Sequence, residues 1–272
     1  MPASSPSFSL HRLVLQAEGP IPARTVSASG PYFEVNIASK QAEAAQRANL
    51  LAHRYAAHAT TPDKAAGGAS NCAGYTYFGE REDGSPHGLG VKEWADGNRY
   101  SGEFRRSKED GLGVFDFVDG SRFAGEFSQS VFHGVGVFKS KTGRLYCGEF
   151  HHGKEEGFGV AEYPSGDKYF GWHAGGKYEG AGVYEHANGS KFSGEHKNGN
   201  AEGFGVCEFA DGSTYNGEYY NHRFEGHAVY EFDSGEKSFD NWVAGNYVSS
   251  ESFDDSNPQH KRILMAARDA KV

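Results

Sequence analysis

Cysteine and methionine are scarce in this chain, which holds three Cys and two Met among 272 residues. Cys72, Cys147 and Cys207 form neither a CxxC pair nor an even set, so no disulfide framework is expected and a reducing compartment is favoured. No apolar run approaches the roughly 20 residues that a membrane-spanning helix needs. These shortages argue against a disulfide-rich secreted domain and against a transmembrane helix.

Basic residues are also in short supply, because 27 Lys and Arg face 36 Asp and Glu and the formal net charge is −9. Nucleic acid and anionic membranes attract basic surfaces, so the bulk charge favours neither as a partner. Glycine and aromatic residues are abundant instead, with 38 Gly and 14% aromatics. Since glycine weakens helices and strands unless a turn or a close approach needs it, we expect a fold of turns and stacked rings.

These glycines and rings recur with a strict period of 23 residues. The pattern Tyr/Phe-x-Gly-Glu starts at Tyr77 and returns, with one substitution in the fifth copy, at residues 100, 123, 146, 169, 192 and 215. We number each copy from position 1 to position 23. Positions 12 and 21 are Gly and position 15 is Val in all seven copies, and a degenerate eighth copy begins near Ser238. Position 3 is also invariant and gives seven repeat glycines that we expect to be structural: Gly79, Gly102, Gly125, Gly148, Gly171, Gly194 and Gly217.

The spacing within one copy predicts a β-hairpin. Because side chains alternate along a strand, the rings and the glycine of positions 1, 3 and 5 share one face. A second strand is expected at positions 13 to 18, with Val on one face and Gly plus an aromatic residue on the other. Asp-Gly or Asn-Gly at positions 20 and 21 indicates a tight turn, as at Asp96-Gly97. The glycines leave space for rings, and each hairpin needs its neighbours to bury them.

The repeated motif resembles the MORN repeat (membrane occupation and recognition nexus) from residue 77 to about 245. The resemblance implies a mostly β chain of the repeat-only type, an elongated single-layer antiparallel sheet of tandem 23-residue hairpins. Similar repeats occur in junctional membrane-tethering proteins, plant phosphatidylinositol-phosphate kinases and flagellar proteins, and beside SET-type methyltransferase domains. The resemblance therefore identifies a fold and leaves the function open.

The segments outside the array have different compositions. Residues 1–36 are rich in Ser, Pro and Ala and predict a disordered or targeting tail, and residues 37–60 predict a helix in which Leu50, Leu51 and Tyr55 could form a small apolar stripe. Residues 61–74 predict a linker before an array over 75–245. Residues 246–272 predict a linker and a short helix with Asn257 as N-cap and Pro258 at its first position. Both helices are expected to cap or adjoin the array, and the alternative is that the C-terminal helix binds a partner.

The sequence lacks the residues that acid/base, metal and nucleophilic chemistry need. The position-4 glutamates should recur about 10 Å apart in equivalent surroundings, which favours a hydrogen-bonding face over an acid/base pair. The same spacing separates His173 from His196, too far apart for one metal ion. No nucleophile motif is present, and nothing like a SET core follows the repeats. We therefore predict a chain that is not an enzyme and takes no metal or other cofactor.

Two functions remain. The first is a scaffold that binds protein partners along the sheet, since aromatic residues anchor protein interfaces well. The second is a phospholipid- or phosphoinositide-binding module. Residues 77–237 hold 17 Lys and Arg against 27 Asp and Glu, so the scaffold is favoured and lipid contact should be weak. We expect a cytoplasmic protein, or alternatively a plastid or other organelle protein addressed by the Ser-rich tail.

One irregular place in the array predicts a candidate partner patch. The fifth copy has Trp172 where the others keep Glu at position 4, and the fifth and sixth copies have His173 and His196 at position 5. Substitutions that break a consistent pattern often mark function, and Trp is enriched among interface hot spots. We expect Trp172 to point away from the rings, and the two histidines could make the patch sensitive to pH. Ordinary repeat drift is the alternative.

Overall fold

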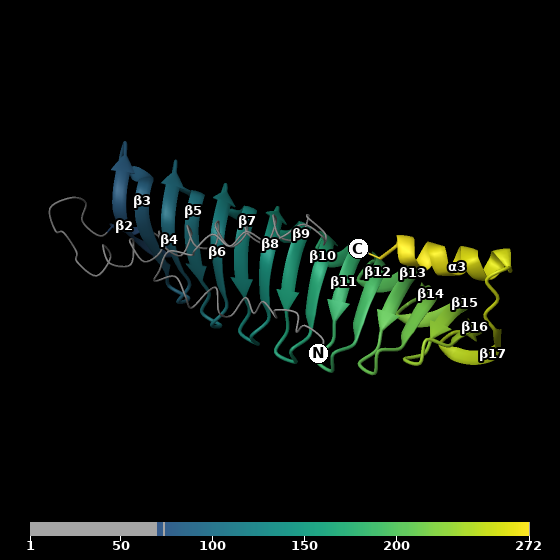
Figure 1. The fold of residues 1–272 in the computed structure, drawn as a ribbon. Helices are drawn as coiled ribbons and strands as arrows, with labels where there is room; N and C mark the ends of the chain where they lie inside the picture. Colours follow the sequence, from purple (N-terminus) through teal and green to yellow (C-terminus); the bar gives the residue numbers. More distant parts are fainter. Residues whose placement is uncertain (1–69, 73, 272) are drawn as a thin grey trace, which may run out of the picture. The chain divides into compact units, whose positions relative to one another are not determined.

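The computed structural model describes residues 70–72 and 74–271, shown in colour in Figure 1. They fall into two compact units that meet between Lys141 and Thr142, which we call unit 1 and unit 2. The tail expected at 1–36, the helix expected at 37–60 and most of the linker expected at 61–74 lie outside the described residues. Within that linker, Ser70–Cys72 is a strand that pairs with the strand after it.

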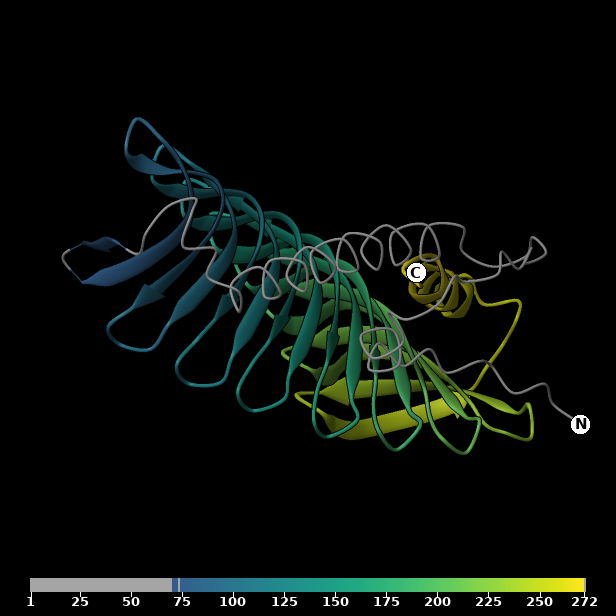
Figure 2. The ribbon, with the colours of Figure 1, turned by 90° about the vertical axis from the view of Figure 1, so that its left-hand side faces the viewer.

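Each unit is a single layer of antiparallel strands in which every strand pairs with the next along the chain (Figure 2). Unit 1 contains β1 Ser70–Cys72, β2 Tyr75–Glu82, β3 Ser85–Trp94, β4 Arg99–Arg105, β5 Lys108–Asp116, β6 Arg122–Ser128 and β7 Val131–Lys139. Unit 2 contains β8 Leu145–His151, β9 Lys154–Glu162, β10 Lys168–Ala174, β11 Lys177–Glu185, β12 Lys191–Lys197, β13 Asn200–Glu208, β14 Thr214–Tyr220, β15 Arg223–Glu231, β16 Lys237–Val243, β17 Asn246–Ser252 and α3 Pro258–Asp269. The tandem hairpins predicted from the sequence are confirmed.

The second strand of the hairpin is longer than the sequence predicted. It begins at position 9, as at Lys108 in β5, whereas the expected start was position 13. A two-residue turn at positions 7 and 8 therefore joins the two strands, and both of its residues have left-handed backbone, with φ of 50° at Arg106 and 68° at Ser107. That conformation matches the right-handed twist of a hairpin. The backbone N–H of Ser107 also donates to the carbonyl of Pro86 in the preceding repeat, at 2.9 Å.

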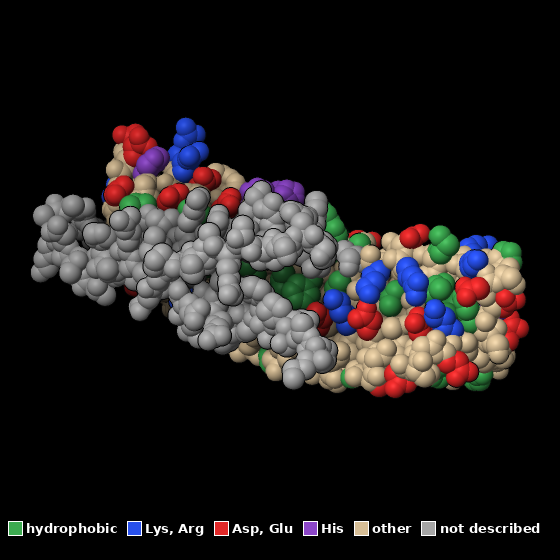
Figure 3. Space-filling view, viewed as in Figure 1, with side chains coloured by type: hydrophobic (Ala, Val, Ile, Leu, Met, Phe, Trp, Pro, Cys, Tyr) green, Lys and Arg blue, Asp and Glu red, His purple; other side chains and the backbone are tan. Residues whose placement is uncertain are grey.

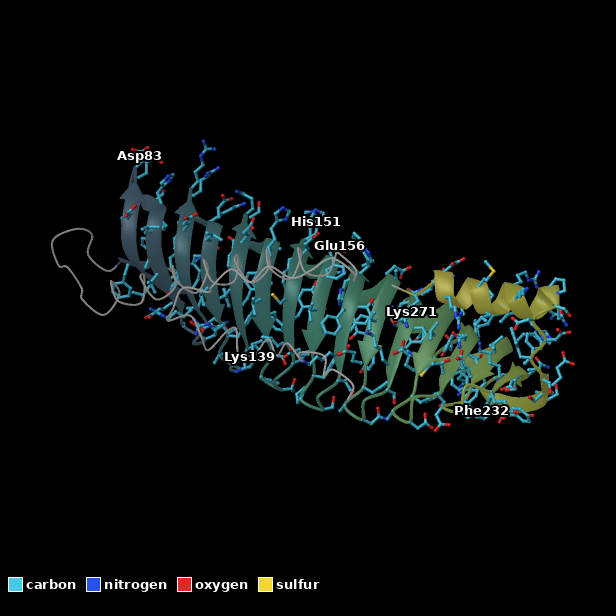
Figure 4. All side chains as sticks on the ribbon, viewed as in Figure 1. Asp83, Lys139, His151, Glu156, Phe232 and Lys271 are labelled. Carbon is cyan, nitrogen blue, oxygen red and sulfur yellow. The ribbon has the colours of Figure 1, made fainter. Side chains whose placement is uncertain are left out.

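The Asp-Gly turns predicted at positions 20 and 21 are confirmed. Gly97 has φ of 93°, a conformation that glycine adopts without steric cost. Its N–H donates to the carbonyl of Trp94 at 3.0 Å, and the Asp96 carboxylate accepts from the N–H of Asn98 at 3.0 Å. Each repeat thus has a two-residue turn at positions 7 and 8 and a longer turn around positions 20 and 21. Phe232, labelled in Figure 4, lies beside the longer turn.

Alternation along the strands gives each sheet two unlike faces. We call the face with the rings of positions 1 and 5 the ring face, and the face with the position-15 valines the valine face. On the ring face, Tyr146 lies across two glycines. A Cβ atom added to Gly148 would stand 2.6 Å from Tyr146 Cζ and 2.8 Å from Gly159 Cα. The invariant glycines therefore make room for rings that lie flat on the sheet.

The position-4 glutamates hold the second strand in shape. The carboxylate of Glu103 accepts from the N–H of Leu112 at 3.2 Å, and Glu80 accepts from Leu89 at 3.3 Å. A Cβ atom on Gly111, whose φ is 106°, would come within 3.0 Å of Glu103 Cδ. The glycine at position 12 therefore leaves space for this carboxylate. The position-4 glutamates thus have a structural role, because the same hydrogen bond recurs from repeat to repeat.

The fifth repeat lacks this hydrogen bond, because Trp172 replaces the glutamate and the space around Gly180 is empty. We predict that Trp172→Glu leaves stability unchanged or raises it by up to about 1 kcal/mol, because it can supply the acceptor that other repeats have. Glu103→Ala, by contrast, should lower stability by about 1 kcal/mol, since the Leu112 N–H loses its partner. Urea unfolding of both variants compares the two. A larger loss in Trp172→Glu than in Glu103→Ala would contradict the structural role of the ladder.

The C-terminal region differs in part from its prediction. The linker expected from residue 246 is wrong over β17, whose residues pair with β16 from Ser238↔Ser252 to Val243↔Asn246. The short helix is confirmed as α3, with the Asn257 side chain accepting from the N–H of Gln259 at 2.9 Å. It packs on β13, β14 and β15 of unit 2 and is the yellow helix of Figures 1 and 2. No helix among the described residues is long and apolar enough to span a membrane.

Candidate functional site: the aromatic surface of the repeats

The rings of positions 1 and 5 form the inner layer of the ring face. Tyr100 stands edge-on between Phe104 of its own repeat, at 5.1 Å, and Phe127 of the next, at 4.8 Å. Tyr100 is fully buried, and Phe104 and Phe127 are nearly so. Edge-to-face pairs at this spacing add to the stability from area burial. These rings are therefore the core of a one-layer sheet and are not available to a partner.

A second set of rings lies on the same face and stays partly exposed. They occupy positions 10, 16 and 18, and we call them the aromatic surface. In unit 1 the aromatic surface comprises Trp94, Phe115, Phe117, Phe132 and Phe138. In unit 2 it comprises Tyr163, Tyr178, Tyr184, Phe209, Phe224, Tyr230 and Phe232.

The aromatic surface of unit 1 is entirely apolar apart from the indole nitrogen. Phe115 contacts Trp94 at 5.3 Å and Phe117 at 4.6 Å between ring centroids, and Phe117 contacts Phe138 at 6.2 Å. Phe132 stacks on the core ring of Phe123 at 4.0 Å and so joins the two layers. Continuous ring-to-ring contact over three repeats gives a rigid apolar strip.

The aromatic surface of unit 2 carries hydroxyl groups among its rings. The hydroxyls of Tyr163 and Tyr178 contact one another, and the Tyr184 hydroxyl donates to the Asp167 carboxylate at 3.3 Å. Burial, followed by the charge of Asp167, raises the pKa of Tyr184 to about 12, so its hydroxyl stays protonated. Tyr230 shares a hydrogen bond with the Ser213 hydroxyl at 2.7 Å. This strip can offer donors as well as rings.

Three cations lie over rings of the ring face, and the first, Arg81 at position 5, is 4.8 Å from the centroid of Tyr77. Lys92 pairs with the buried Glu109 at 3.0 Å and lies over the rings of Tyr75 and Trp94, at 4.6 and 4.7 Å from their centroids. In unit 2, Arg144 pairs with Glu155 and lies over Tyr146 and Tyr163, at 5.6 and 5.5 Å. Each of the last two charges is neutralised by a glutamate at position 10 and shielded by rings. Lys92 and Arg144 therefore present little charge to a partner.

The structure does not bring Trp172, His173 and His196 of the predicted patch onto one surface. Trp172 is 48% exposed and contacts Phe158 on the valine face, so it points away from the rings as expected. His173 and His196 are 3% and 4% exposed in the inner layer of the ring face, on either side of Tyr169. Adjacent residues of one strand point to opposite faces, so residues 172 and 173 cannot share a surface. Partner binding at Trp172 stays a prediction.

Burial also changes the chemistry of these histidines. It lowers the pKa of His173 and of His196 to about 4, so both rings are neutral at physiological pH. Burial raises the pKa of the Cys147 and Cys207 thiols to about 12 and about 11, which leaves neither as a thiolate nucleophile. Among residues 74–271, no group of three His, Cys, Asp or Glu side chains is placed to hold a metal ion.

Comparison with known proteins agrees with this architecture. The MORN repeat matches residues 77–99, 100–122, 123–143, 146–168, 174–191, 192–214 and 215–237. The fifth match begins after Trp172 and His173, where the sequence departs from the pattern. No curated protein matches the chain.

Solved structures share only a distant likeness. The SAS-4 TCP domain of Drosophila melanogaster, in complex with a proline-rich motif of Ana2, is 12% identical and has a TM-score of 0.37 over 56% of this chain and 83% of that chain. The TCP10 domain of Danio rerio CPAP, as its E1021V mutant, is 12% identical with a TM-score of 0.27 over 68% of this chain and 99% of that chain. The seven matched repeats span more than half of the chain, which therefore belongs to the MORN-repeat family.

Proposed function

We propose that this chain is a non-catalytic scaffold that binds protein partners on the aromatic surface. The observation that carries the proposal is the second layer of partly exposed rings, held rigid on the core rings beneath it. Aromatic side chains that are already ordered lose little entropy on binding and are enriched among interface hot spots. A binding surface of this kind needs no reactive group.

The chemistry of the surface defines the partner. Because Lys92 and Arg144 are neutralised and shielded, a highly charged partner gains little from these two residues. A polypeptide segment with apolar side chains fits the strip of unit 1, where Phe115 and Phe117 dominate. The strip of unit 2 also suits a segment with hydrogen-bond acceptors, since Tyr184 and Tyr230 carry hydroxyls.

Affinity capture from the native source, followed by mass spectrometry, tests this surface. Phe115→Ser with Phe117→Ser in unit 1, and Tyr230→Ser with Phe232→Ser in unit 2, should each reduce bound partner at least tenfold, since loss of an aromatic hot spot costs about 2 kcal/mol or more. Trp172→Glu, on the opposite face, is the matched control and should capture the same partners as wild type. If the control loses its partners while the ring variants keep them, binding belongs to the valine face around Trp172 and the proposal fails.

Membrane lipid is the competing ligand that the family name suggests, and charge placement weighs against it. Most cations of the array pair with acids, such as Arg99 with Glu93 at 3.2 Å and Arg122 with Asp116 at 3.5 Å. Figure 3 shows Lys and Arg interspersed with Asp and Glu over the end of the chain that carries α3. Flotation with phosphoinositide vesicles at physiological salt should leave the protein unbound. Strong, salt-sensitive flotation would replace the protein partner with a lipid surface.

A further inference from the structure

The valine face carries one straight apolar row in each unit. In unit 1 the residues directly opposite one another on successive strands are, in order, Phe78, Val91, Ser101, Val114, Ala124 and Val137. In unit 2 a corresponding row contains Val206, Asn216, Val229 and Phe239, the last on β16. Valines alternate with smaller side chains along each row, and we call each row, which crosses the strands, the trough of its unit.

Helix α3 covers the trough of unit 2. Helix α3 places Ile263 and Leu264 against Val229 and Phe239, and His260 stacks on Phe239 at 3.9 Å. Its buried residues are 260, 263, 264 and 267, the spacing of one helix face. Near the end of α3, Arg268 and Lys271 pair with Glu231 and Glu208 of position 17, and Lys271 is labelled in Figure 4.

The trough of unit 1 has a similar order of side chains. The described elements of unit 1 are all strands, so none of them is a helix that could cover this trough. Phe78 stands at the outer end of its row as Phe239 does in unit 2, and it is 38% exposed. Leu89, Leu112 and Val135 at position 13 are partly exposed beside the row, where Phe204 packs against the α3 cluster in unit 2. The position-17 acids are here Glu93 and Asp116, which pair with Arg99 and Arg122 and still have side chains 50% and 39% exposed.

We propose that residues 39–58 of this same chain form a helix that docks on the valine row of unit 1, as α3 docks on that of unit 2. The sequence repeats the spacing of α3, with Ala48, Leu51, Ala52 and Tyr55 at i, i+3, i+4 and i+7. Leu50 lies about 150° around the helix from this stripe. The docked face is therefore made by Leu51 and Tyr55 without Leu50.

Lengths and charges agree with this occupant. Twenty helical residues extend about 30 Å, and the six strands β2 to β7 span about 24 Å. The 11 residues from 59 to 69 can reach up to about 36 Å, enough for the chain to return from the trough to Ser70. Arg47 and Arg54 lie about 10.5 Å apart on one flank of the stripe, close to the roughly 9.6 Å expected between acids one repeat apart, Glu93 and Asp116.

Hydrogen exchange of the full-length chain, followed by mass spectrometry, tests the docking. Amides of residues 48–56 should exchange at least tenfold more slowly than in an isolated peptide of residues 39–58. Leu51→Glu should remove this protection, whereas Leu50→Glu, with the same charge and the same parent residue on the opposite flank, should keep it. Exchange at peptide rates in the wild-type chain, or equal effects of the two leucine variants, would overturn the proposal.

Thiol labelling gives a second readout on the sheet side. With Phe78→Cys in the full-length chain, labelling at residue 78, read by peptide mapping, should accelerate at least fivefold on adding Leu51→Glu and stay unchanged with Leu50→Glu. Both measurements are repeated over a hundredfold range of protein concentration. Protection that grows with concentration would show that a second copy occupies the trough and would overturn docking by the chain's own segment.

Discussion

Gly148→Val is expected to lower the free energy of unfolding by about 3 kcal/mol, the upper part of the range for overpacking. The first atom of the new side chain would stand 2.6 Å from Tyr146 Cζ and 2.8 Å from the Cα of Gly159. Neither obstacle can move cheaply, because Tyr146 is fully buried between Phe150 and His173 and Gly159 belongs to the paired strand. Urea unfolding followed by circular dichroism measures the loss.

The seventh repeat supplies the control for this experiment. Ala228 replaces glycine at position 14 there, yet the Tyr215 hydroxyl still donates to the carbonyl of Glu218 at 3.0 Å, as in the other tyrosine repeats. One methyl group at position 14 is thus compatible with the fold, so Gly159→Ala should cost less than Gly148→Val. Ala228→Gly should cost only about 1 kcal/mol, through chain entropy. A Gly148→Val protein that unfolds at the wild-type urea concentration would refute the packing of rings over glycine.

The period of 23 residues was enough to predict the hairpins and their two faces, because alternation along a strand is a geometric necessity. The turn at positions 7 and 8 was not predictable in the same way. Arg106-Ser107 and Gln129-Ser130 adopt left-handed backbone although neither pair contains Gly or Asn. The hydrogen bond of each turn to the preceding repeat, such as Ser130 N–H to the Glu109 carbonyl at 2.8 Å, favours that conformation over local preference.

Strand β17 shows a second limit of the sequence. Its residues are all exposed, no repeat glycine lies among them, and Tyr247, 5.6 Å from Trp242 between ring centroids, is their one ring. It extends the sheet through backbone pairing with β16, which any sequence with a suitable preceding turn can make, and the Ser250 hydroxyl adds a bond to Asp240 at 2.6 Å. The pattern of side chains therefore ends before the sheet does.

The candidate site was predicted in kind but not in detail. The sequence indicated exposed rings, and the structure shows that positions 1 and 5 are buried while positions 10, 16 and 18 form the accessible layer. How deeply a ring is buried in a one-layer sheet depends on how rings overlap across strands, as when Phe132 stacks on Phe123. The repeat period alone does not predict that overlap. The irregular Trp172 and His173 were found from the pattern, yet they lie on opposite faces.

The same irregular histidines predict that unit 2 loses stability in mild acid. Burial lowers the pKa of His173 and His196 to about 4, against 6.5 for an unperturbed ring. Between these values the unfolded chain binds protons that the folded chain does not, so stability is complete above pH 6.5 and falls as the pH drops towards 4. Each ring contributes up to about 3 kcal/mol of this loss, from 1.36 kcal/mol per pKa unit. Urea midpoints between pH 7.5 and pH 4.5 measure it.

Replacing both histidines by the consensus ring isolates their contribution. His173→Phe with His196→Phe should remove most of the loss between pH 6.5 and 4.5, because His222 is then the one described histidine of unit 2 whose pKa burial lowers. Near neutral pH the double variant should be at least as stable as wild type, since His173 Nε2 and His196 Nδ1 are buried without a hydrogen-bond partner among the described residues. His186→Phe, at an exposed position of the same unit, should keep the wild-type profile.

The lowered pKa of Asp167 and Asp211 affects stability only at more acidic pH, because carboxylates held ionised in the fold lose their contribution as pH falls below about 4. A double variant that loses as much stability as wild type between pH 6.5 and 4.5 would mean that other groups carry the acid sensitivity of unit 2.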